Sequence, residues 1–207
     1  MSTTPLIHVV DDDPSMRTAL LRLLGAAGFE TRGYSSTGEF LLQPLPDRPG
    51  CLLLDLRMPG PSGLELQAAL LQKKVMLPIV FLTGHGSVDS SVRAMKAGAV
   101  DFIEKPFASE TLLDSLDGAL SRLASPSERD PATDTAVTKL ALLSSREREV
   151  LEGLLAGLPN KSIAYDLAIS PRTVEIHRAR VMDKMGARSL SELIRLALAA
   201  GMRPWSQ

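Results

Sequence analysis

The sequence predicts an α/β domain built on a five-stranded parallel sheet, followed by a smaller all-helical domain. Over the first 123 residues, short apolar runs alternate with amphipathic helical patterns, as expected for strands of a parallel sheet and the helices that connect them. After residue 139 only helical patterns remain. Residues 124–139 between them are rich in Pro, Ser, Thr and charge, a composition typical of a linker. We therefore expect domains at residues 1–123 and 140–207, joined by this linker.

The strands are predicted from short apolar runs that stop at turn-forming or charged residues. The clearest is Cys51–Asp55, which ends in a carboxylate and is soon followed by Pro59 and Gly60. An apolar run of this kind is typical of a strand covered on both faces. Phe29–Tyr34 is more polar, so we expect it near an edge of the sheet. The other expected strands are Ile7–Val10, Pro78–Leu82 and Asp101–Glu104.

The helices of the first domain are predicted to cover both faces of the sheet. The first should begin at Asp13 and Pro14, because Asp is favoured as an N-cap and Pro at the first helical position. It should end in the glycine-containing segment 25–28. Further helices are expected at residues 36–43, 63–72, 87–97 and 109–123.

The second domain is predicted to contain four helices. Ser144 and Glu147 have the spacing of a capping box ahead of a helix that ends near residue 156. Asn160 is expected to cap a short second helix, and Ser170 and Pro171 to open a third that runs to about residue 185. A fourth is expected at residues 189–201. The tight turn between the second and third is typical of a helix-turn-helix.

The composition is that of an ordinary folded protein, with 44% hydrophobic residues and a net charge of -1. The charge is unevenly distributed. Residues 1–125 carry 11 basic and 14 acidic residues, whereas residues 141–207 carry 10 basic and 7 acidic ones. The basic second domain is therefore the candidate for binding nucleic acid.

We expect a cytoplasmic protein with no membrane association. Its single cysteine, Cys51, lies within an apolar run and cannot form an internal disulfide, which suits a reducing compartment. The N-terminus shows no basic segment followed by an apolar core, and no apolar stretch reaches the roughly 18 residues of a membrane span.

Polar side chains follow four of the predicted strands where each strand ends. They are the acids of residues 11–13, Asp55, Thr83 and Lys105. The carboxyl ends of parallel strands meet at one edge, so these residues are expected to converge. Clustered carboxylates favour a hard cation such as Mg²⁺, and a carboxylate can accept a phosphoryl group. Thr83 and Lys105 could then bind phosphoryl oxygens.

Each of these residues also has an ordinary structural interpretation. A single Asp at a strand end is commonly a turn or cap residue, a loop Thr is commonly only a hydroxyl at the surface, and a Lys is commonly solvated. The combination, with each residue in order at a strand end, favours a functional site.

Four motifs resemble the receiver domain of two-component response regulators over residues 4–123. They are Val-Val-Asp-Asp-Asp (9–13), Leu-Asp-Leu-Arg-Met-Pro-Gly (54–60), Thr-Gly-His-Gly (83–86) and Ala-Gly-Ala-Val-Asp-Phe-Ile-Glu-Lys-Pro-Phe (97–107). The resemblance implies a doubly wound flavodoxin/CheY-like fold and phosphorylation of Asp55 by a sensor histidine kinase. It also implies that Mg²⁺ or Mn²⁺ is held by Asp11, Asp12, Asp55 and the backbone carbonyl of Arg57. Asp13 keeps the role of helix cap.

The same resemblance implies a switch. Thr83 would turn toward the phosphoryl group, and the ring of Phe102 would enter the space that Thr83 leaves. The helix Ser87–Ala97 and the strand face Asp101–Glu104 would then form a homodimer surface. Apolar residues of that helix are also compatible with ordinary core positions. Lys105 and Pro106 resemble the family's cis-proline step.

The two histidines of the first domain, His8 and His85, are not expected to take part in the predicted phosphorylation chemistry. His8 lies within a strand and is expected to be a packed or edge residue, whereas His85 follows Thr83 and Gly84 in a loop near the predicted pocket. Their spacing does not suggest a zinc site.

The second domain resembles the LuxR-type helix-turn-helix over residues 140–202, which places the chain in the NarL/FixJ class. Two segments resemble the FixJ branch in particular: Gly-Leu-Pro-Asn-Lys-Ser-Ile-Ala-Tyr-Asp-Leu (157–167) and Ser-Pro-Arg-Thr-Val-Glu (170–175). The third helix would enter the major groove of promoter DNA. Many such domains carry Lys where this chain has Glu175, so base preference does not transfer from other branches.

Val174, Val181 and Met185 are expected to face the interior of this domain. The predicted base-facing residues are Glu175, Ile176 and Ala179. The predicted phosphate-facing or otherwise DNA-facing residues are Lys161, Arg172, Thr173, Arg178, Arg180 and Lys184.

The sequence therefore predicts a phosphorylation-activated transcription regulator and not an enzyme, apart from self-phosphorylation and slow autodephosphorylation. The principal alternative is a phosphotransferase or phosphatase that uses Asp55 as a covalent intermediate. Hydrolases of that kind carry an Asp-x-Asp motif. In this chain Arg57 stands at the position of the second Asp, two residues after Asp55. An RNA-binding output domain is a third possibility, which the helix-turn-helix motifs of the second domain disfavour.

Overall fold

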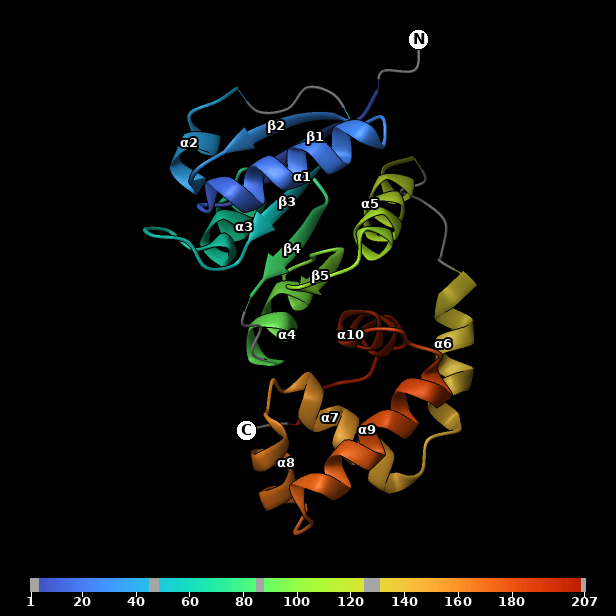
Figure 1. The fold of residues 1–207 in the computed structure, drawn as a ribbon. Helices are drawn as coiled ribbons and strands as arrows, with labels where there is room; N and C mark the ends of the chain where they lie inside the picture. The colour runs from blue at the N-terminus through green and yellow to red at the C-terminus, as the bar shows by residue number, and fades with distance from the viewer. Residues whose placement is uncertain (1–3, 45–48, 85–87, 125–130, 206–207) are drawn as a thin grey trace. The chain divides into compact units, whose positions relative to one another are not determined.

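The computed structural model describes residues 4–44, 49–84, 88–124 and 131–205 (Figure 1). These residues group into two compact units. The first contains a parallel sheet and most of its helices. The second contains the helices from residue 131 onward, together with α4 (Val88–Lys96). The helices of the described part of the chain lack the length and apolar character needed to cross a membrane.

The sheet has five parallel strands in the order β2-β1-β3-β4-β5. The strands are β1 (Leu6–Val10), β2 (Glu30–Tyr34), β3 (Gly50–Asp55), β4 (Ile79–Thr83) and β5 (Asp101–Glu104). The five-stranded doubly wound sheet predicted from the sequence is thereby confirmed. The first five residues of the central strand β3 are buried, and the more polar β2 lies at an edge, both as expected.

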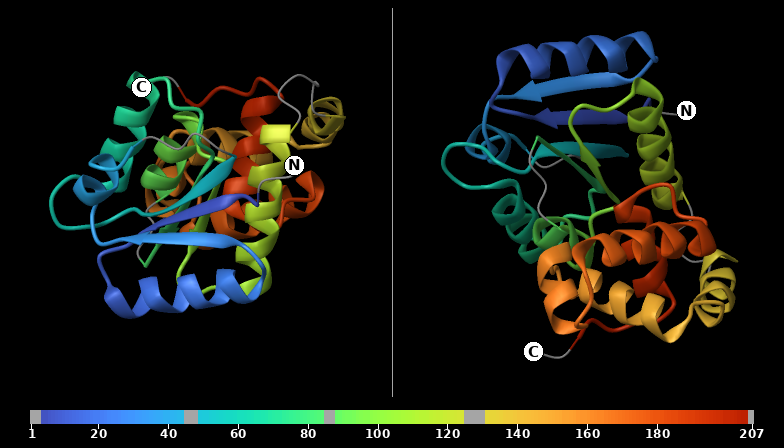
Figure 2. Two further views of the ribbon diagram at one scale, coloured as in Figure 1. Left: turned by 90° about the horizontal axis from the view of Figure 1, so that it is seen from above. Right: turned by 60° about the horizontal axis from the view of Figure 1, so that its bottom comes forward.

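The helices of the first unit are α1 (Pro14–Ala26), α2 (Thr37–Leu41), α3 (Gly63–Gln72) and α5 (Ser109–Ala124). The carboxylate of Asp13 accepts hydrogen bonds from the amides of Ser15 and Met16, which confirms the predicted cap of α1. Helix α1 runs alongside β2 in both views of Figure 2.

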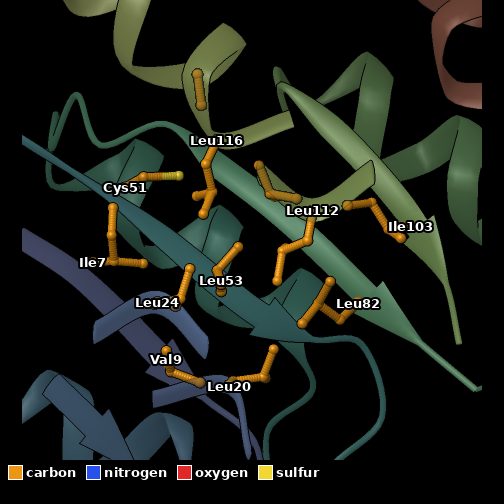
Figure 3. Packing of buried hydrophobic residues seen from close by; sticks show 12 residues of the cluster. Ile7, Val9, Leu20, Leu24, Cys51, Leu53, Leu82, Ile103, Leu112 and Leu116 are labelled. Carbon is orange, nitrogen blue, oxygen red and sulfur yellow. The ribbon is translucent and has the colours of Figure 1, made fainter. Parts of the chain in front are cut away.

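One face of the sheet is covered by α1 and α5, whose apolar side chains pack on alternate residues of the strands (Figure 3). Leu24 of α1 and Leu112 and Leu116 of α5 meet Leu53 and Leu82 in this cluster. The opposite face receives α3. Its first residue, Gly63, lies so close to the sheet that a Cβ there would collide with the Asp55 carbonyl and the Phe81 ring. A glycine is therefore needed where α3 begins beside the end of β3.

The helical unit contains α6 (Pro131–Ala141), α7 (Ser145–Leu155), α8 (Asn160–Asp166), α9 (Pro171–Met185) and α10 (Leu190–Ala199). The four helices from α7 to α10 match the prediction. The capping box of Ser144 and Glu147 and the Ser170 cap of α9 are both present. Between α8 and α9, Ala168 adopts a left-handed conformation (φ 52°), and the chain reverses within a few residues.

Two local expectations were wrong. The sequence pattern indicated no helix within 124–139, yet residues 131–141 form α6, which packs against α9 and α10. The predicted cap at Asn160 is not formed either. Pro159 holds the N-cap position of α8, and the amide oxygen of Asn160 instead accepts a hydrogen bond from Arg178.

Candidate acidic site and nucleic-acid interface

Residues that are distant in sequence meet at the carboxyl edge of the sheet. Asp11 follows β1, Asp55 ends β3 and Lys105 follows β5, and the order β1-β3-β4-β5 makes these strand ends neighbours. The ammonium nitrogen of Lys105 lies 2.7 Å from Oδ2 of Asp11 and 3.3 Å from Oδ2 of Asp55. The predicted convergence of these three side chains is therefore present in the structure.

Asp12 completes an acidic cluster. One carboxylate oxygen from each of Asp11, Asp12 and Asp55 can be chosen so that all lie within 4.8 Å of one another. Asp11 is buried, Asp55 is partly buried and Asp12 is exposed, so the cluster opens toward solvent at one side. Several carboxylate oxygens at this spacing, with the exposed Asp12 on one side, fit the ligand preferences of a divalent hard cation.

Backbone amides and a guanidinium hold the cluster in place. The amide of Asp13 donates to Oδ1 of Asp11 at 2.9 Å, and the amide of Arg57 donates to Oδ1 of Asp55 at 3.4 Å. The guanidinium of Arg17 in α1 donates to the backbone carbonyl of Asp11 at 2.6 Å. The acids are thus oriented from the loops and from the first helix, and not only from the strands.

The electrostatics of the site reflect an excess of negative charge. Burial raises the pKa of Asp55, and the negative charge of Asp11 acts in the same direction, against the opposing effects of Lys105 and the Arg57 amide. Burial alone would lower the pKa of Lys105. Its hydrogen bond to Asp11 and the charges of both carboxylates outweigh burial, so that this pKa is raised and the side chain is held in its charged form.

The predicted switch residues are both buried at the β4–β5 pair. Thr83 ends β4, and the ring centroid of Phe102 lies 6.4 Å from that of Phe81. The backbone amide of Lys105 donates to the Thr83 carbonyl at 2.7 Å, and the Lys105–Pro106 peptide bond is cis, as the resemblance implied.

The two histidines of the first unit have different outcomes. His8 is packed, as expected. Its Nδ1 lies 2.9 Å from the Tyr34 hydroxyl, and its ring packs against Tyr34 and Phe40. His85 lies outside the described residues.

In the helical unit, α9 has one buried and one exposed face. Val174, Val181 and Met185 are buried, as predicted. The exposed face includes Ile176, whose exposure of 44% is high for a large apolar side chain. Predicted DNA-facing residues that are also exposed are Lys161 on α8 and Arg172, Glu175, Ala179 and Arg180 on α9. Thr173 is partly buried, and its hydroxyl lies 2.8 Å from that of Ser170.

Three of the predicted DNA-facing cations have partners inside the unit, and the first is Arg172, whose guanidinium lies 3.0 Å from Glu175 on the same helix. The guanidinium of Arg178 donates to the Asn160 amide oxygen at 2.8 Å. The ammonium of Lys184 donates to Oε2 of Glu147 at 2.7 Å and to the Leu142 carbonyl at 3.2 Å. The hydrogen bond from Lys184, with help from the Ser144 amide, lowers the pKa of Glu147 to about 2.

One exposed side chain was absent from the predicted interface. Tyr165 on α8 is 87% exposed and lies four residues after Lys161, so the two share one face of that helix. The exposure of Tyr165 marks it as a candidate for contact with a partner. This exposure could not be predicted from the sequence, because helical spacing alone does not show whether a Tyr faces the interior or the solvent.

Family models match most of the chain. The model described as "Response regulator receiver domain" matches residues 7–117, and the model described as "Bacterial regulatory proteins, luxR family" matches residues 141–197. The first span includes the acidic cluster and the second includes α8 and α9.

Individual relatives match nearly end to end. "Transcriptional regulatory protein FixJ" of Rhizobium meliloti (strain 1021) is 49% identical over 199 residues, which cover 96% of this chain and 97% of that protein. Among solved structures, full-length FixJ from B. japonicum is 45% identical with a TM-score of 0.56, covering 96% of this chain and 98% of that one. The response regulator StyR is 42% identical with a TM-score of 0.57, covering 95% and 99% of the two chains.

Proposed function

The chain belongs to the FixJ-type response regulators, which join a receiver domain to a LuxR-type DNA-binding domain, and on this premise we propose how its phosphorylation site acts. It is a phosphorylation-activated, DNA-binding transcription regulator. A receiver domain implies a sensor kinase as a partner, and a LuxR-type domain implies DNA. The acceptor, the metal and the mode of activation are our proposals.

Asp55 is the proposed phosphoryl acceptor. The observation that carries this assignment is that Asp55 lies at the end of the central strand, 3.3 Å from the Lys105 ammonium and beside the buried carboxylate of Asp11. One carboxylate oxygen of Asp55 would form the new bond to phosphorus as the bond from phosphorus to the donor breaks, so that the kinase histidine, or acetate when acetyl phosphate is the donor, is the leaving group. Lys105 would then bind a phosphoryl oxygen, for which its charged form is suited. The hydroxyl of Thr83 would donate to another.

Asp11, Asp12, Asp55 and the backbone carbonyl of Arg57 are the proposed ligands of Mg²⁺ or Mn²⁺. The carboxylate spacing within 4.8 Å and the open side at Asp12 support this assignment. A bound divalent cation would offset the repulsion between the carboxylate nucleophile and the incoming phosphoryl group. Asp11 would serve both the cation and Lys105.

Activation would proceed through Thr83 and Phe102, which lie on neighbouring strands. We propose that a shift of Thr83 toward the phosphoryl group favours one of two packings of the Phe102 ring. The altered surface would be that of α4 and β5, through which two copies of the chain dimerise; Ser87, the first residue of the predicted surface, lies outside the described residues. Dimerisation raises the affinity for two adjacent DNA half-sites through effective concentration. A release of the DNA-binding domain from the receiver is the alternative mode.

DNA would be bound through the exposed face of α9 and one face of α8. Arg172, Arg180, Lys161 and Tyr165 are the proposed phosphate contacts, since phosphate contacts commonly come from basic and hydroxyl side chains. Ile176 and Ala179 are proposed to meet base edges. Arg178 and Lys184 are assigned positions that orient α9, because their charged groups are bound to Asn160 and Glu147.

The catalytic chemistry of the chain is proposed to end with its own phosphorylation and slow dephosphorylation. Besides the leaving group of the donor (acetate when acetyl phosphate is used), no released product other than inorganic phosphate is expected. Turnover of added phosphomonoesters by the purified chain would contradict this and favour the phosphatase alternative.

The acceptor assignment is tested by Asp55→Asn. Incubation with radiolabelled acetyl phosphate and Mg²⁺ should label the wild-type chain and leave the variant unlabelled. Asp114→Asn is a matched control, because Asp114 is an exposed acid of α5, and it should label like the wild type. Undiminished labelling of Asp55→Asn would refute the assignment.

A further inference from the structure

Glu175 is a carboxylate on the surface that we assign to DNA. Its side chain is 50% exposed and lies between the buried Val174 and the exposed Ile176 on α9. One oxygen of Glu175 lies 3.0 Å from the guanidinium of Arg172, which is 81% exposed. The carboxylate is therefore oriented by a neighbour on the same helix, one turn toward the end that meets base edges in helix-turn-helix proteins.

A carboxylate in this position would oppose DNA binding unless it found a hydrogen-bond donor. The phosphates repel it, and most base edges in the major groove present acceptors. Guanine presents O6 and N7, and thymine presents O4 and a methyl group. Donors are found only on the exocyclic amines of cytosine and adenine, and on adenine the acceptor N7 stands beside the amine. Cytosine is the base whose major-groove edge offers a carboxylate a donor with no acceptor on the same base.

The other charged groups of α9 determine which residue can balance the negative charge of Glu175. Lys184 is bound to Glu147. Arg178 donates to Asn160, and its charge also attracts Glu175 without an ion pair between the two side chains in the described structure. Arg172 is its observed partner. An Arg that stays highly exposed while it contacts a carboxylate can also approach a phosphate or a guanine, which would offset the repulsion of Glu175 by the backbone.

We infer that Glu175 selects a cytosine at one position of the DNA site bound by each chain, with Arg172 as its positioning residue. The inference rests on the proposed DNA-binding function of α9. It differs from that proposal in naming the base and the atom, the N4 amine of cytosine. A glutamine at the same position would present both a donor and an acceptor, which match N7 and N6 of adenine.

The test is selection from a randomised duplex library by the full-length chain after treatment with acetyl phosphate, followed by anisotropy titrations of single-base variants of the selected site. The wild type should favour cytosine at one position by about tenfold, within the usual range for a good base contact. In Glu175→Gln this preference should disappear in favour of adenine, and preferences elsewhere should remain. Glu175→Ala should lose discrimination there without gaining adenine.

Glu149→Gln is the matched control. Glu149 forms the same i,i+3 ion pair with Arg146 on α7, at 2.8 Å, but lies outside the proposed reading surface. It should keep the wild-type preferences. If Glu175→Gln retains the cytosine preference, the inference is wrong while DNA binding stands. If the wild type enriches no sequence at all, the proposed function fails together with the inference.

Discussion

Two lysines in this chain make similar contacts in two different regions, with opposite consequences. In the sheet unit, Lys105 bridges Asp11 at 2.7 Å and Asp55 at 3.3 Å. In the helical unit, Lys184 bridges Glu147 at 2.7 Å and the Leu142 carbonyl at 3.2 Å. Each ammonium joins segments that are distant in sequence, and each has a buried carboxylate as a partner.

The difference lies in how many carboxylates each lysine must balance. Lys105 faces an acidic cluster of three, and the pKa of Asp55 is raised because burial and Asp11 outweigh Lys105. Lys184 balances a single carboxylate, and the pKa of Glu147 is lowered to about 2. A cluster with an excess of negative charge gains from an added cation, which makes the carboxylates of Asp11, Asp12 and Asp55 compatible with divalent metal binding. A balanced pair has no such need and stabilises the fold.

The largest effect in this comparison is expected for Lys184→Met. The substitution leaves the buried carboxylate of Glu147 without its cation, and the loss of a hydrogen bond to a charged group costs about 1.5–3 kcal/mol. Trp205, the only tryptophan, donates to Glu152 in the same unit, so its fluorescence during urea unfolding reports the stability of the helical unit. Lys161→Met, at an exposed position of α8, should leave that stability within about 0.5 kcal/mol. An unchanged midpoint in Lys184→Met would contradict the structural role.

The pH dependence of the same pair gives an independent check. Because the folded-state pKa of Glu147 is below its ordinary value of 4.5, its stabilising contribution is present above about pH 4.5 and is lost as the pH falls toward 2. The wild type should therefore lose Trp205-reported stability across this window. Glu147→Gln should lose less over the same range. Equal slopes in the two proteins would show that other groups dominate acid unfolding.

A smaller effect is expected from removing α6, which the sequence pattern assigned to a linker. Lys139 of α6 donates to the Met185 carbonyl at 2.9 Å, at the end of α9, and Ala136 is fully buried. A fragment of residues 131–207 should therefore be more stable than a fragment of residues 140–207, by about 1–2 kcal/mol for one hydrogen bond and the buried apolar contact. Fluorescence of Trp205 in urea measures both. Equal stabilities of the two fragments would show that residues 131–139 do not stabilise the helical unit and act only as part of the linker.

Helix α6 also shows where prediction from the sequence stops. Its residues Pro131–Ala141 include three Thr, a Pro and charged residues, which carry weak helical propensity. What stabilises the helix is tertiary packing on α9 and α10, and single-sequence patterns do not contain that information. The strands and the other helices were predictable because their apolar periodicity and caps are local properties of the chain.

The acidic site was predictable for a topological reason. In a parallel sheet every strand ends at the same edge, so Asp11, Asp55 and Lys105 had to meet once the strands were identified correctly. No such rule operates in the helical unit. The partners of Arg178 and Lys184 depend on how α7, α8 and α9 pack, and a charged helix face looks the same in sequence whether it meets solvent, DNA or a buried acid. Exposure of Tyr165 was hidden for the same reason.

The smallest effect should be a stabilisation by Asp55→Asn. Replacing an ionised carboxylate whose pKa is raised by burial and by Asp11 removes an unfavourable charge, which we expect to raise the stability of the sheet unit by about 1 kcal/mol without divalent cations. Cys51 is the only cysteine, is fully buried, and burial raises its pKa to about 12, so its labelling by a thiol reagent reports opening of the sheet.

Labelling in mild urea with EDTA should be slower in the variant than in the wild type. The difference should shrink as the pH falls, because wild-type Asp55 becomes neutral below its raised pKa and the two proteins then carry the same charge there. Asp114→Asn should label at the wild-type rate. Faster labelling of Asp55→Asn at neutral pH would mean that Lys105 balances the cluster after all, and that the two lysines do not differ in the way their carboxylate partners suggest.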